Sequence, residues 1–219
     1  NISFSQERED LILSPDYEKE INYVPLHDAI SISDNTSLRN LLLNTMLSSA
    51  KRKISNISLA IASEDTEASH YAATIMMDVL SELQSAAQNL IENLQKYPED
   101  VEMNILAFDY LYELLELNIM SSIEQEAYIH TLNDVADNLF KYNLWYMTAD
   151  HYLKMTELFI SISDYNMAYR WTLRAEKYRP DTLETYKAKL HLYYVQKDNK
   201  AFFEHLDKLK NSSIIVDKE

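Results

Sequence analysis

The sequence predicts an all-α protein in which successive helix pairs stack into a right-handed α-solenoid. One observation behind this is the absence of glycine from all 219 residues. Glycine supplies the positive φ angles of tight β-hairpins, so a chain without it is poorly suited to a many-stranded β fold. The other is the spacing of apolar residues, which recur every three or four positions from Leu26 almost to the end. Helices tolerate the lack of glycine because Asn, Asp and Lys can end them.

A third observation lies in residues 149–182. Two apolar periodic runs flank the polar turn at 164–166, and Pro180 ends the second run because proline has no N–H and disfavours a helical residue before it. The spacing resembles that of a tetratricopeptide (TPR) repeat, a pair of antiparallel helices about 34 residues long. The residues that carry this resemblance are Leu153, Phe159, Ala168, Ala175 and Pro180.

The TPR pattern also makes local predictions. We expect Ala168 and Ala175 to be buried where the two helices approach closely. Two positions depart from the pattern, since Thr156 replaces the usual glycine and Thr172 the usual aromatic residue. A single repeat cannot bury its apolar face alone, so neighbouring repeats are predicted. Residues 183–213 resemble a degenerate second repeat, and residues 101–141 a more divergent helix pair.

The individual helices follow from the periodic runs and from the residues before them. Asp or Asn before several runs can accept hydrogen bonds from free backbone N–H groups, as at Asp34 or Asn35, Asp65 and Asp164. The run after Asp65 carries a long amphipathic stripe. The predicted helices are 26–32, 36–48, 50–62, 67–96, 100–119, 122–140, 145–162, 165–178, 182–196 and 199–209.

The first half of the chain differs in type from the second. Residues 34–46 and 65–77 share an Asp, polar residues, a basic residue or His, and then an apolar run, with starts 31 residues apart. This arrangement resembles HEAT-type helices. Pro98 and the acids after it mark the clearest boundary. We therefore predict a leader and connector at 1–25, a HEAT-like helical region at 26–97 and TPR-like helical repeats at 98–219.

Composition narrows the classes of function. A formal net charge of −15 argues against binding to nucleic acid or directly to anionic lipid. The one basic cluster, Lys51–Lys53, is expected in a solvated loop between two helices. Without glycine there is no P-loop, dinucleotide fingerprint or nucleophile elbow, and without cysteine no disulfide or zinc-thiolate site. The chain has no initial Met and no signal peptide, so we expect an excised part of a longer protein.

No catalytic constellation is recognisable, and we predict no enzyme activity, no metal site and no cofactor. None of the six histidines pairs with another at a spacing of four, so no helix presents a two-His metal face. His70 is expected to be buried or half-buried, with a partner contact as the alternative. Most of the 16 tyrosines are expected to pack between helices with their hydroxyls at the surface, and some to line a groove.

Solenoids of this kind mostly bind other proteins, and the first helix of each repeat lines their concave wall. Helical spacing within residues 149–196 nominates one set of partner-binding residues. They are Asp150, Leu153, Glu157, Glu184, Lys187, His191 and Tyr194.

Taken together, the chain resembles the soluble part of the PelE family, the TPR-containing components of Pel-type exopolysaccharide machines. The segments that carry the resemblance are V-P-L-H-D-A-I at 24–30, D-T-E-A-S-H-Y-A-A at 65–73 and F-F-E-H-L-D-K-L-K-N-S at 202–212. The order of a helical N-terminal portion followed by TPRs also agrees.

The resemblance implies a non-catalytic scaffold at the cytoplasmic face of the cell membrane, tethered by an upstream segment. Its implied protein partners are a polytopic membrane transporter, a glycosyltransferase and a cyclic-di-GMP receptor. Two alternatives stay open: a peptide-sensing TPR regulator, and a helical enzyme with an acidic site.

Overall fold

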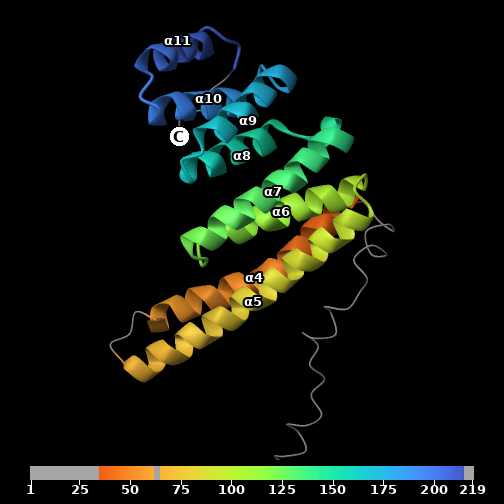
Figure 1. The fold of residues 1–219 in the computed structure, drawn as a ribbon, viewed down its shortest axis with the longest axis vertical. Coiled ribbons are helices and arrows are strands. Elements are labelled where there is room, and N and C mark those ends of the chain that lie inside the picture. Colours follow the sequence, from red (N-terminus) through yellow and green to blue (C-terminus); the bar gives the residue numbers. More distant parts are fainter. Residues whose placement is uncertain (1–34, 62–64, 215–219) are drawn as a thin grey trace, which may run out of the picture. The chain divides into compact units, whose positions relative to one another are not determined.

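The computed structural model describes residues 35–61 and 65–214, and this part of the chain is entirely helical (Figure 1). It contains eight α-helices and one short 3₁₀-helix, with no strand among the described residues, so the predicted all-α class is confirmed. The chain divides into two compact units, Asn1–Leu41 and Leu42–Glu219, and only the start of the first helix is described in the first unit. The predicted leader at 1–25, the helix at 26–32 and the motif at 24–30 lie outside the described residues.

Helix α4 (Asn35–Ile61) corrects one prediction, because it runs without a break where two helices, 36–48 and 50–62, were expected. No proline or other strong helix breaker stands at the expected junction, and Ala50 is buried. The basic cluster therefore lies within a helix and not in a loop. Lys51 Nζ lies 2.6 Å from Glu113 Oε2, and Lys53 Nζ lies 3.9 Å from Glu82 Oε2.

Helix α5 (Thr66–Lys96) confirms the long predicted helix and its cap, since the Asp65 side chain accepts from two backbone N–H groups of the first turn. Its buried stripe runs through Ala72, Val79, Leu83, Ala87, Leu90 and Leu94. His70 is exposed, so the expectation of a buried histidine was wrong. It precedes Ala72 by two positions, which places it on the opposite side of the helix.

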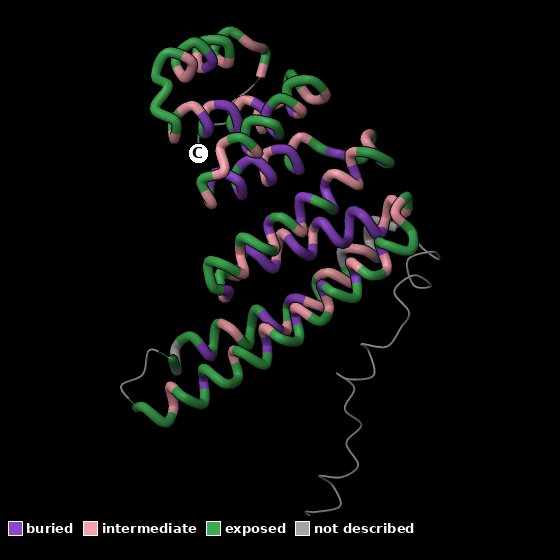
Figure 2. The backbone as a smooth tube through the Cα atoms, in the orientation of Figure 1, coloured by how far each residue is buried: buried purple, intermediate pink, exposed green. Residues whose placement is uncertain are grey.

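Helix α6 (Val101–Glu116) is the most enclosed element, and it packs against α5 and against α7 (Ser122–Tyr142). Figure 2 shows its nearly continuous burial. The buried Asn104 ties the start of α6 to neighbouring segments: its Nδ2 donates to the Pro98 carbonyl at 2.8 Å, and its Oδ1 accepts from Asn138 Nδ2 at 3.1 Å. The hydroxyl of the buried Tyr110 donates to the Leu83 carbonyl at 2.9 Å, which joins α6 to α5.

A 3₁₀-helix (Leu144–Tyr146) leads into α8 (Ala149–Ser161), and α9 (Tyr165–Tyr178) follows. The two α-helices pack closely, as predicted from the small residues Ala168 and Ala175, which are both fully buried. Thr156 and Thr172 are also fully buried. Their hydroxyls bond to carbonyls one turn back on the same helix, at 2.8 Å in each case, so neither buries an unsatisfied donor.

Helices α10 (Leu183–Val195) and α11 (Asn199–Lys210) repeat the preceding pair in register. Thr148 and Thr182 cap α8 and α10 and stand 34 residues apart. Asp164 and Asp198 cap α9 and α11 and are separated by the same 34 residues. Each of α8, α9 and α10 packs against the other two, and α11 packs against α10.

The turns inside the helix pairs show how the chain manages without glycine. Asn118, Ser163 and Lys197 have φ values of 53°, 61° and 59°, and each stands two positions after the last residue of α6, α8 or α10. This left-handed conformation is the one that glycine usually supplies after a helix. After Ser163 and Lys197, the next N–H bonds back to Phe159 and Tyr193 carbonyls, respectively.

In the part of the chain that the structure describes, none of the helices is both long enough and apolar enough to cross a bilayer.

Candidate protein-binding groove

The predicted partner-binding residues lie on α8 and α10, which pack against each other. Asp150, Glu157, Lys187, His191 and Tyr194 are exposed. Leu153 and Glu184 are half-buried. These exposures leave most of the set open to a partner, although they do not show that one binds.

Glu157 is the centre of the electrostatic interactions within this set. Its Oε1 lies 3.9 Å from His191 Nδ1, across the packing of α8 on α10. Partial burial raises the pKa of Glu157, and the negative charges of Glu116 and Asp150 raise it further. His191 and Lys187 act in the opposite direction. Glu157, Lys187 and His191 therefore belong to one interacting surface.

The structure does not bring every predicted residue into that interaction. Tyr194 is 72% exposed, and its ring centroid lies 6.5 Å from that of Phe202, which places it toward α11. Asp150 is joined to Lys154 on its own helix, with Oδ2 and Nζ 2.8 Å apart.

A hollow of about 240 Å³ lies beside Glu157, and we call it the α6–α8 hollow. Its lining comes from the end of α6, the start of α7 and one side of α8. The lining residues are Tyr112, Leu115, Glu116, Asn118, Gln125, Ile129, Lys154, Glu157, Leu158 and Ser161. The hollow therefore adds α6 and α7 to the surface that Glu157 presents on α8.

Sequence reasoning missed the contribution of α6. Lys154 Nζ lies 4.5 Å from the centre of the Tyr112 ring, so a cation–π contact joins α8 to α6. Burial raises the pKa of Tyr112 to about 12, together with the negative charges of Glu116, Glu157 and Asp150. The signal was available: residues 101–141 had been interpreted as a divergent helix pair, whose first helix should present the same face as α8.

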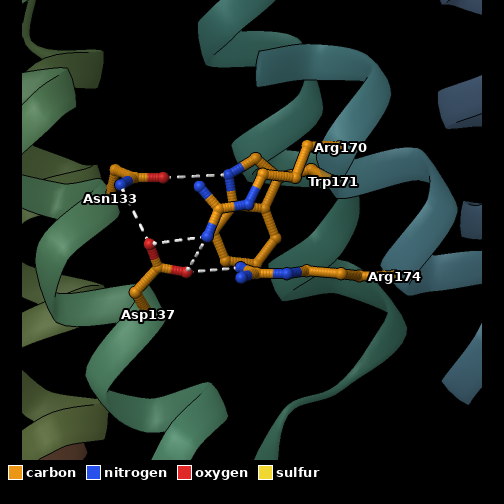
Figure 3. A network of polar contacts seen from close by, with 5 residues as sticks. All are labelled: Asn133, Asp137, Arg170, Trp171 and Arg174. Atoms are coloured by element: carbon orange, nitrogen blue, oxygen red, sulfur yellow. Dashed lines mark hydrogen bonds and ion pairs between the residues drawn. The ribbon is translucent and has the colours of Figure 1, made fainter. Parts of the chain in front are cut away.

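A second polar cluster joins α7 to α9 and has the character of a structural contact (Figure 3). Arg170 and Arg174 both donate to the carboxylate of Asp137. Trp171 is fully buried, and its Nε1 donates to Asn133 Oδ1 at 3.1 Å. Asn133 Nδ2 also donates to Asp137 Oδ2 at 3.3 Å, so these contacts link the side chains of α7 to those of α9.

The aromatic residues divide between core and surface. Tyr110 and Tyr152 are fully buried, whereas Trp145 and Tyr194 are among the most exposed large side chains. The expectation that most tyrosines pack between helices therefore holds for some of them, such as Tyr110 and Tyr152, and not for others, such as Tyr194.

Among the described residues, no group of three or more His, Asp or Glu side chains is arranged to hold a metal ion. Comparison of the chain with protein-family models, with curated protein sequences and with solved structures found no match.

Proposed function

We propose that the chain is a non-catalytic scaffold of TPR-like helical repeats that binds proteins through the first helices of its pairs. The observation that carries this proposal is the open polar surface that α8 and α10 form around Glu157, Lys187 and His191. The 34-residue register of the caps supports the repeat interpretation, since TPR units have this length. The packing of α8, α9 and α10 on one another is also what stacked helix pairs require.

Charge reversal tests the groove directly. We expect Glu157→Lys and Lys187→Glu each to weaken partner capture, because both side chains are exposed and complementary charges set partner choice. Neither substitution should lower the melting temperature, since surface changes alter stability by about 0.5 kcal/mol or less. Pull-down with the purified variants and thermal denaturation are the two measurements.

Asp78→Lys is the matched control, because Asp78 is exposed on α5, a helix that contributes nothing to the groove. It should capture partners as the parent chain does. If Glu157→Lys and Lys187→Glu also capture partners normally, the groove assignment is wrong.

Because the chain resembles the PelE family, we further propose that it assembles a Pel-like exopolysaccharide complex at the cytoplasmic face of the membrane. Its partners would be a polytopic membrane transporter, a glycosyltransferase and a cyclic-di-GMP receptor. Two of the three resembling segments fall on described helices: residues 65–73 include the cap and first turns of α5, and residues 202–212 include most of α11.

A peptide-sensing regulator is the second candidate, and the α6–α8 hollow favours it. Ligand pockets for small molecules measure about 300–1,000 Å³, so a hollow of about 240 Å³ is of a size to take one side chain of a peptide. A sensor would bind a short free peptide. A scaffold would bind only a folded partner protein and not a peptide taken from it.

A further inference from the structure

The α6–α8 hollow has an apolar floor. Leu115, Ile129 and Leu158 come from three different helices, and each is at least nine-tenths buried in the described structure while still lining the hollow. A floor of this kind contacts the methylene stem of a long side chain favourably, because burying apolar surface stabilises a complex.

The rim of the hollow is polar, and its lining holds two carboxylates and one cation. Lys154 is the one cationic residue of the lining, and its Nζ lies 2.8 Å from Asp150 Oδ2, outside the lining. Glu116 and Glu157 both belong to the lining, and each raises the pKa of Tyr112 through its charge. Glu116 also raises the pKa of Glu157, and that pKa stays raised although two cationic side chains of α10 act to lower it. A cation placed near them would relieve this repulsion.

We propose that the α6–α8 hollow binds the side chain of one lysine or arginine from a partner segment, with its stem on the apolar floor and its charged end between Glu116 and Glu157. This deepens the proposed function and rests on it, because the segment would lie along the groove of α8 and α10. Charge-assisted hydrogen bonds to carboxylates are about twice as strong as neutral ones, so they supply the selectivity. Gln125 and Asn118 complete the rim with side-chain amides.

The experiment is an NMR titration of the chain with N-acetyl-L-arginine methylamide and with the corresponding lysine compound. We expect saturable shifts of the side-chain amide signals of Gln125 and Asn118. The uncharged N-acetyl-L-glutamine methylamide should bind at least about fivefold more weakly, because a neutral end gains no charge-assisted bond.

Substitution ties the binding to the two carboxylates. The double variant Glu116→Gln with Glu157→Gln keeps both side-chain shapes and should weaken arginine binding by about tenfold. Asp78→Asn on α5 is the control and should leave it unchanged. Equal shifts with the glutamine compound, no saturable shifts, or unchanged binding by the double variant would each overturn the proposal.

The titration is independent of partner capture, so the two proposals can fail separately. If the arginine compound binds at the hollow but Lys187→Glu, a change outside its lining, leaves capture intact, the hollow stands and the assignment of the groove to α8 and α10 fails. If capture depends on Glu157 and Lys187 but the compounds do not bind, the groove assignment stands and the hollow proposal is wrong.

Discussion

At the scale of single residues, His205 is the side chain through which α11 packs on α10. It is the one buried residue of α11, and its ring stacks on Tyr186 with the centroids 4.8 Å apart. Tyr193 meets the same ring edge-on at 6.0 Å. The Nε2 atom has no hydrogen-bond partner within the described residues. The packing of α11 on α10 therefore depends on an uncharged imidazole.

This environment predicts a pH dependence of stability. Burial, together with the positive charges of Lys189 and Lys208, lowers the pKa of His205 from 6.5 to about 4, against the opposing effect of Glu176. Between these two pKa values the unfolded state binds a proton that the folded state does not, so stability is complete above pH 6.5 and falls as the pH drops toward 4.

Chemical denaturation at a series of pH values from roughly 7.5 to 4, a range that includes both pKa values, measures this effect. His205→Phe keeps an aromatic ring against Tyr186 and should flatten the curve in that window. His70→Asn, at an exposed position, should keep the slope of the parent chain. An unaltered slope in His205→Phe would show that other groups cause the loss.

At the scale of the helices, the turns after α8 and α10 each contain a residue with a strained backbone conformation, and a substitution could relieve that strain. Ser163 and Lys197 adopt left-handed φ values that cost a residue with a Cβ atom about 1 kcal/mol. We therefore expect Ser163→Gly and Lys197→Gly each to stabilise the fold by about 0.5 kcal/mol, after allowing for the greater freedom of glycine in the unfolded state.

Lys200→Gly serves as the control, because Lys200 is exposed within α11 and glycine inside a helix costs about 1 kcal/mol relative to alanine. The measurement is urea unfolding of all three variants. If Ser163→Gly and Lys197→Gly lowered the free energy of unfolding, the two side chains would stabilise the fold by more than their left-handed backbone conformation costs.

The close approach of α8 and α9 makes a second prediction at this scale. Ala168 is fully buried, so Ala168→Leu should overpack the pair and cost roughly 1–3 kcal/mol. Ala73→Leu adds the same atoms at an exposed position of α5 and should change the free energy of unfolding little. A tolerated leucine at Ala168 would contradict the predicted tight crossing.

At the scale of the whole molecule, the proposed scaffold role predicts the effect of removing the repeats. Deleting residues 101–219 from the native protein should abolish polymer secretion, because the deletion removes α6 to α11 and the groove with them. Co-purification from membranes should show loss of the synthase and transporter. The purified chain should show no hydrolase or transferase activity on nucleotide sugars.

Immunoblotting should confirm that the shortened protein and its partners are still present, so that a simple loss of expression is not mistaken for loss of assembly. If the shortened protein still brings down the synthase and transporter together, these helices are not the scaffold.

The sequence by itself determined the features that depend on local physics. Apolar periodicity and the cap at Asp164, in the polar turn at 164–166, predicted a helix at 165–178, and α9 has these bounds. The long run at 67–96 differs from α5 by one residue at its start. The small residues Ala168 and Ala175 were placed correctly in the core, because a helix pair needs small side chains where it crosses closely.

The tertiary structure decided what depends on contacts between distant residues. The ion pairs of Lys51 and Lys53 are of this kind, because the carboxylates near these two side chains belong to α6 and α5. The α6–α8 hollow has the same origin: Glu116 and Glu157 stand 41 residues apart in the sequence, and only packing makes them line one cavity. Periodicity predicts which face of a helix is buried, but it does not tell which other helix covers that face.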